Sequence, residues 1–232
     1  NLTGVRFLTG ITWNAVSGTQ IPPGGRVVIP RRSTAFALRY PGVTALGEYY
    51  VLDTNQLDNG GEELGLVDAA GNDIKRFTYN DNAPWPTAAD GTGPSLQLVA
   101  PAANPDHNNP LHWRSGTAAG GNPGAAGGTA PPANPLADDN NNGLSNLVDY
   151  ATGGAALPAY TVAGGLLEIT LPRAPGADVI PDIETTGTLT GWTSAGASLL
   201  SRTTDGGGIE WLTFSLTIPP GSEDRLFARV RY

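Results

Sequence analysis

The chain has 232 residues, with 32 glycines and 20 prolines, nearly twice the average share of these residues, and no cysteine or methionine. Helical bundles and collagen are excluded, because glycine and proline interrupt helices and the glycines follow no period of three. The absence of cysteine excludes disulfides and thiolate metal sites, and a net charge of −8 disfavours nucleic acid as a partner. No apolar run approaches the length of a membrane span. Because methionine is absent, we expect Asn1 to be an internal residue of a longer chain.

Short runs of β-type residues bounded by turn signals predict strands in the first half of the chain. These runs are 5–8, 26–29, 48–52, 63–68, 74–79 and 95–99. In the run 74–79, Ile74, Arg76 and Thr78 are expected on one face of a strand and Lys75, Phe77 and Tyr79 on the other. The runs follow one another closely and no helix is expected between them. The first half is therefore predicted to be an antiparallel β-sandwich.

The middle of the chain has a different character. Residues 116–137 are rich in Gly, Ala and Pro and lack periodicity, which is typical of a semi-rigid linker. A short helix is predicted where apolar residues recur at helical spacing, at Leu144, Leu147, Val148 and Ala151. After this helix, β-type runs resume and predict a second, smaller β domain. Its expected strands are 166–171, 179–185, 191–193, 209–218 and 226–232.

The most specific signal is a calcium-loop pattern, D-x-[DN]-x-[DN]-G, which begins at Asp138. Alternate side chains can converge their oxygens, Gly143 permits the sharp turn, and Asp149 replaces the usual Glu at the twelfth position. The predicted calcium ligands are Asp138, Asn140, Asn142, the main-chain carbonyl of Leu144, Asn146 and Asp149. Because only two of them are carboxylates, we expect a weak site, with a Kd of roughly 10⁻⁴–10⁻³ M. The competing interpretation is an asparagine-rich turn that caps the helix without a metal.

No residues with a catalytic pattern emerge. His107 and His112 lie five residues apart in a proline-interrupted loop and match no metal or nucleophile signature. Glu62 and Glu63 are adjacent, and adjacent side chains in an extended strand point to opposite faces, so the two cannot flank one glycosidic bond. We therefore expect no catalytic residues and no enzyme activity.

The five tryptophans allow two interpretations, a sugar-stacking platform or packing within the β domains. They are Trp13, Trp85, Trp113, Trp192 and Trp211. Single tryptophans in β domains more often pack in the core or at its rim. Trp85, held between two prolines, is expected to have a structural role.

Several motifs of the first half follow one another in an order found in a known family. They are Asn1–Phe7 (NLTGVRF), Leu57–Asp68 (LDNGGEELGLVD), Tyr79–Pro86, Asp90–Leu98, Trp113 and Gly121–Gly124. Together they resemble a lamin-tail domain, whose fold is an immunoglobulin-like β-sandwich and whose described role is binding or adhesion. The family's opening strand motif has no counterpart here. The resemblance therefore implies a sandwich without its first strand.

The second half carries its own resemblance. Residues 138–151 resemble the D-x-D-x-D-G-L-x-N-x-x-E-Y-A segment related to dockerin and thrombospondin type 3 calcium loops. In large exported bacterial proteins this segment often precedes a C-terminal β module with a central W-T and a final F-x-R-(L/V)-R strand. Residues 191–193 and 227–231 look like that module. The resemblance implies a non-catalytic accessory region of a larger secreted or cell-surface bacterial protein.

The sequence thus predicts an all-β chain in three parts. A lamin-tail-like sandwich spans 1–125, a linker with the calcium loop and one short helix spans 126–157, and a C-terminal β domain spans 158–232. We expect a calcium-stabilised binding, adhesion or anchoring region whose ligand is an unidentified protein or glycan. The alternative is an accessory carbohydrate-binding region of a polysaccharide-active or other hydrolase.

Overall fold

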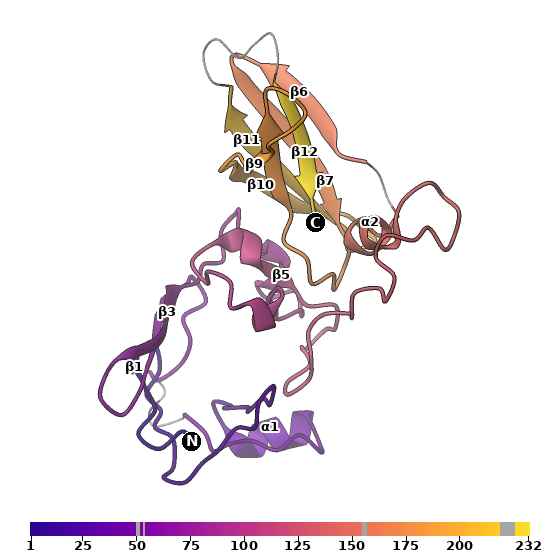
Figure 1. The fold of residues 1–232 in the computed structure, drawn as a ribbon. Helices are drawn as coiled ribbons and strands as arrows, with labels where there is room; N and C mark the ends of the chain where they lie inside the picture. The colour runs from indigo at the N-terminus through magenta and orange to yellow at the C-terminus, as the bar shows by residue number, and fades with distance from the viewer. Residues whose placement is uncertain (50–51, 53, 155–156, 219–225) are drawn as a thin grey trace.

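The computed structural model describes residues 1–49, 52, 54–154, 157–218 and 226–232 (Figure 1). Within them the chain forms twelve strands in four antiparallel sheets and only two short α-helices, which confirms the predicted all-β class. No helix in these residues is long and apolar enough to cross a membrane.

The first half of the chain holds two small sheets (Figure 1). Three strands pair in the order β1-β2-β3, namely β1 (Arg6–Thr9), β2 (Glu63–Val67) and β3 (Asp73–Thr78). The second sheet pairs β4 (Leu96–Leu98) with β5 (Trp113–Ser115). Three single-turn helices lie between these strands, namely η1 (Thr87–Ala89), η2 (Pro101–Ala103) and η3 (Pro110–His112). In β3, half-buried Lys75 and Phe77 alternate with exposed neighbours, as predicted.

Two predictions for this half are wrong. Residues 26–29 form no strand, because prolines flank them and Val28 makes only an isolated bridge to Ala45. A helix, α1 (Ser33–Arg39), occupies a stretch where none was expected. It has no buried residue and therefore lacks the apolar period by which helices are detected. The predicted strand at 48–52 lies partly outside the described residues, and its first two residues are not in a strand.

The second half contains two sheets that share one core. The first has the order β10-β11-β7-β6, from β6 (Ala159–Ala163), β7 (Leu166–Arg173), β10 (Ser198–Thr204) and β11 (Glu210–Thr217). The second has the order β12-β8-β9, from β8 (Asp182–Thr186), β9 (Thr193–Ser194) and β12 (Phe227–Arg231). The five predicted strands of this half are confirmed, with shifted ends. β6 and β10 were not predicted, because most of their residues are exposed on both faces.

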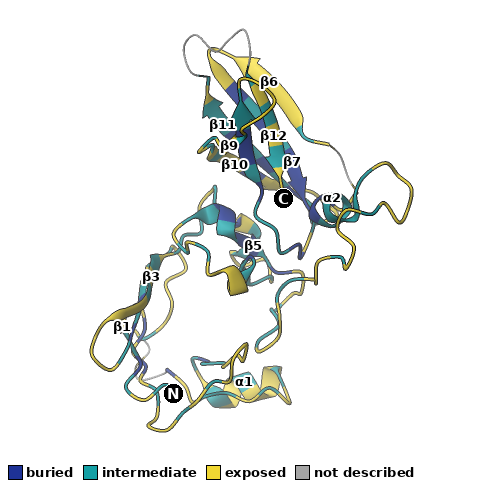
Figure 2. Cartoon of the chain, in the orientation of Figure 1, coloured by how far each residue is buried: buried dark blue, intermediate teal, exposed yellow. Residues whose placement is uncertain are grey.

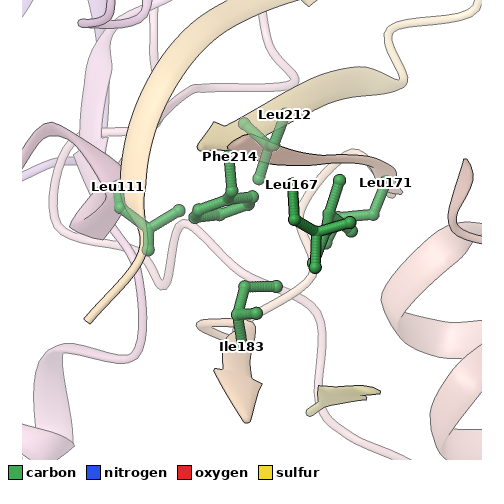
Figure 3. Packing of buried hydrophobic residues seen from close by; sticks show 7 residues of the cluster. Leu111, Leu167, Leu171, Ile183, Leu212 and Phe214 are labelled. Carbon is green, nitrogen blue, oxygen red and sulfur yellow. The ribbon is translucent and has the colours of Figure 1, made fainter. Parts of the chain in front are cut away.

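The core of this half is built from alternate residues of β7 and β11. Figure 3 shows the side chains that meet there, from Leu111, Leu167, Leu171, Ile183, Leu212 and Phe214. β7 and β11 carry the darkest buried stretches in Figure 2, whereas β6 and α1 are largely exposed. Leu111 belongs to η3, so the first half of the chain contributes a side chain to the core of the second.

Two arginines fasten η3 and β5 to the larger sheet. Arg173 donates to the carbonyls of Leu111 (2.9 Å) and Trp113 (2.7 Å) and pairs with Glu210 (2.6 Å). Arg202 donates to the same Trp113 carbonyl at 3.0 Å and to that of Pro110 at 2.9 Å. Burial and repulsion from Arg173 lower the pKa of Arg202 to about 10, against the attraction of Glu210. The two charges are stabilised in this buried place by main-chain carbonyls and one carboxylate.

We predict that Leu171→Ala lowers the free energy of unfolding by about 3 kcal/mol, because the fully buried side chain leaves a cavity. The matched control is Leu200→Ala on β10, where the leucine is 56% exposed and its loss costs less than about 0.5 kcal/mol. Urea unfolding followed by tryptophan fluorescence measures both. Equal losses for the two variants would contradict the assigned core.

Candidate metal-binding loop

The predicted calcium loop leads into helix α2 (Asn146–Thr152), where the sequence predicts a helix (Figure 1). Ser145 caps its start by accepting the N–H of Val148 at 3.4 Å, and Gly153 ends it in the left-handed conformation. The last turn packs on β7, where Ala151 is fully buried and its carbonyl accepts the N–H of Ala174 at 2.8 Å. The loop is thereby attached to the larger sheet.

The start of the loop is organised around the carboxylate of Asp138. One oxygen accepts the N–H of Asn142 at 3.1 Å and the other accepts the N–H of Gly143 at 3.0 Å. Gly143 has a φ of +86°, which L-residues rarely adopt, so the turn depends on glycine at this position. The backbone thus folds back over Asp138 and fixes the orientation of its carboxylate.

Asp149, in the first turn of α2, closes the loop from the other side. Its carboxylate accepts hydrogen bonds from the amide of Asn140 (2.7 Å) and from the amide of Asn142 (2.9 and 3.1 Å). Because Asn142 also contacts Asp138, four of the predicted ligands lie in one connected network. The structure brings together Asp138, Asn140, Asn142 and Asp149.

The other two predicted ligands are engaged differently. The amide of Asn146 donates to the carbonyl of Asn134 (2.9 Å) and to Asp139 (2.8 Å), and it accepts the N–H of Asp139 at 3.1 Å. The side chain of Asn146 therefore holds the start of the loop in place. Its hydrogen bonds among the described residues go to Asn134 and Asp139 and not to the other predicted ligands. Leu144 joins the network through its N–H, which donates to Asn142 at 2.8 Å, so the role of its carbonyl stays a prediction.

The donor set fits calcium better than a transition metal. All of its side-chain ligands offer oxygen, the donor that calcium prefers. The amide oxygens of Asn140 and Asn142 each accept one main-chain N–H, and an amide oxygen has two lone pairs, so each keeps one for a cation. In the described residues no three His, Cys, Asp or Glu side chains are grouped to hold a metal.

The remaining polar candidates have structural partners. His107 contacts the carbonyl of Pro105 at 2.8 Å, and burial lowers the pKa of its imidazole. His112 contacts the carbonyl of Asp106 at 2.7 Å. Glu62 accepts from Asp58 and Tyr79, whereas Glu63 pairs with Arg76, so the two glutamates face different partners.

Three of the five tryptophans are buried, namely Trp13, Trp85 and Trp113. Trp85 packs against Trp113 at 5.9 Å between ring centroids, in keeping with its predicted structural role. Of the half-buried pair, Trp192 lies under the guanidinium of Arg229 at 4.4 Å. These three buried rings therefore do not form a sugar-stacking platform on the surface.

Comparison with known proteins gives no relative: no protein-family model and no curated protein matches the chain. The lamin-tail and dockerin-like resemblances therefore stay predictions.

We predict that Gly143→Ala lowers the free energy of unfolding by about 1 kcal/mol, because alanine is strained at this φ although its methyl group meets nothing within 4 Å. Gly206→Ala is the control, since that glycine also has open space and lacks a positive φ. Thermal unfolding monitored by circular dichroism distinguishes the two. An unchanged free energy of unfolding in Gly143→Ala would show that the loop adopts another backbone path.

Proposed function

We propose that residues 138–149 bind calcium and that the chain is a non-catalytic, calcium-stabilised binding or anchoring region of a larger secreted or cell-surface protein. The observation that carries the proposal is the joining of Asp138, Asn140, Asn142 and Asp149 into one hydrogen-bonded network. These residues are far enough apart in sequence to need a folded loop, and their spacing is that of a calcium loop. The ligand is proposed to be a protein or a glycan.

A bound calcium ion supplies a double positive charge between two carboxylates at opposite ends of the loop. Asp138 stands at the end of the linker, and Asp149 stands in the first turn of α2. The amide groups of Asn140 and Asn142 both contact Asp149. Their oxygens and the two carboxylates would hold the ion and tie the linker to the helix.

Helix α2 connects the loop to the contacts between the first and second halves of the chain, so an ion that fixes the loop would also affect these contacts. Next to Asp149, the hydroxyl of Tyr150 donates to the carbonyl of Thr129 at 2.6 Å and accepts the N–H of Asp178 at 2.8 Å. The carboxylate of Asp178 in turn pairs with Arg114 of β5 at 2.5 Å. Arg114 is only 2% exposed, so this pair lies inside the junction.

The affinity expected of the loop supports the proposed location outside the cell. A site with two carboxylates and two amides binds weakly, with a Kd of about 10⁻⁴–10⁻³ M, as calcium sites of extracellular modules do. Such a site is filled only where free calcium is near millimolar. The proposed role is therefore that of a stiff spacer or anchor, whose stiffness depends on extracellular calcium.

We predict that about 10 mM calcium stabilises the full chain by about 1.4 kcal/mol if the Kd is near 1 mM, because only the folded loop binds. Asp149→Asn abolishes this gain. Asp73→Asn, the same charge change in an exposed pair on β3, preserves it. Calorimetric titration and thermal unfolding give the measurement, and the absence of both heat and stabilisation in the unaltered chain would refute a calcium site.

We also predict that Tyr150→Phe leaves calcium binding intact but removes the effect of calcium on the contacts of Asp178. The variant should bind calcium within about twofold of the unaltered chain, yet lose about 1–2 kcal/mol of stability, because the N–H of Asp178 loses its partner. In the unaltered chain calcium should slow hydrogen exchange at this N–H, and in the variant it should not. Tyr160→Phe on exposed β6 serves as the control. Equal protection by calcium in Tyr150→Phe would contradict the coupling.

A further inference from the structure

A cavity of about 460 Å³ lies where the two small sheets of the first half meet. Each of four strands contributes an apolar side chain to its lining, namely Leu64 from β2, Phe77 from β3, Leu96 from β4 and Trp113 from β5. The volume is within the range of small-ligand sites. The cavity is distant in sequence from the calcium loop and shares no residue with it.

The aromatic part of the lining is held firmly. Phe77 stacks on Trp113 with 5.5 Å between ring centroids and 30° between ring planes. The indole N–H of Trp113 donates to the carbonyl of His107 at 2.8 Å, which fixes the ring. Tryptophan and phenylalanine faces attract cations through their ring quadrupoles.

The lining also has polar residues, the neutral Asn59, Tyr79 and Asn80 and three charged residues, all of them acidic. Asp58, Asp81 and Asp90 line the cavity, and no lining residue is basic. The side chain of Asp58 accepts only the N–H of Gly60, and that of Asp81 accepts only the amide of Asn82, among the described residues. None of the three aspartates has an ion-pair partner in the part of the chain that the structure describes.

The pKa of Tyr79, another lining residue, is also affected by the negative charge around the cavity. Its pKa is raised by burial first, and then by the negative charges of Glu62 and Asp58. An anionic ligand would be repelled by these negative charges, and no basic lining residue would offset the repulsion.

We propose that this cavity binds an organic cation carried on a hydrocarbon stem, that is, the ammonium of a lysine-like group or the guanidinium of an arginine-like group. The stem packs on the apolar wall and the cation lies near the aromatic faces and the three carboxylates. The inference is independent of the calcium site, so either can fail without the other.

The test titrates the full chain with n-hexylammonium and measures binding from the Trp113 indole resonance in NMR spectra. Hexanol and hexanoate are the matched neutral and anionic probes. We expect n-hexylammonium to bind at least about tenfold more tightly than either, with an affinity that falls as salt rises. Equal binding of hexanol would overturn the proposal, because it would leave no role for charge.

The variants test the carboxylates directly. The triple variant Asp58→Asn, Asp81→Asn and Asp90→Asn should weaken binding of n-hexylammonium about tenfold and leave that of hexanol unchanged. Asp90→Asn alone is the fallback if the triple variant does not fold, since the Asp90 side chain makes no hydrogen bond in the described residues, and it should weaken binding about threefold. Asp73→Asn lies outside the cavity and is the charge-matched control. Unchanged affinity in the folded cavity variants would overturn the proposal.

A capped glycine-lysine-glycine peptide separates two sources of the cation. Binding of the peptide as tight as that of n-hexylammonium supports a protein partner with an exposed lysine. Binding of the free amine alone supports a small-molecule ligand of the same chemistry. Binding of neither would contradict the proposal.

Discussion

Two buried guanidinium groups hold the main chain of residues 110–113 against the large sheet of the second half. Arg173 and Arg202 both donate to the carbonyl of Trp113, and Glu210 is the carboxylate between them. Burying two cations beside one anion is costly unless other oxygens complete their hydrogen bonding. The carbonyls of η3 and β5 accept from the terminal nitrogens of both guanidinium groups, and of the nitrogens of these two groups only the Nε of Arg202 is left without a partner among the described residues. The sheet and the segment therefore depend on each other. With the main chain fixed there, Leu111 reaches the core, and the two halves of the chain share one hydrophobic cluster.

Helix α2 provides a second connection between the two halves of the chain. Helix α2 has only seven residues, too few to be stable alone, and it is stabilised by packing on β7 and by the hydrogen bonds of Tyr150. The proposed calcium loop ends inside this helix. A cation at the loop would therefore act on an element whose position already matters to the Arg114–Asp178 pair. Through this arrangement, weak calcium binding would have a structural effect away from the ion.

Local patterns were enough to predict some elements but not others. β7, β11 and α2 were predicted because their apolar residues repeat at the period of the element that they form. β6 and α1 were missed because exposed segments carry no such period. The loop spacing identified the four side chains that converge. It placed Asn146 in the site as well, whereas the structure pairs Asn146 with Asp139 and Asn134, which depends on the path of the linker. The buried arginines and the acidic cavity combine residues from distant segments, and no local pattern reports such combinations.

The proposed role of the chain depends on calcium binding by the loop before α2. The most direct measurement is a crystal structure of the full chain grown in millimolar calcium, with the ion identified by anomalous scattering. We predict one calcium ion bound by Asp138, Asn140, Asn142 and Asp149. A loop without an ion under these conditions, with both asparagine amides still donating to Asp149, would contradict it.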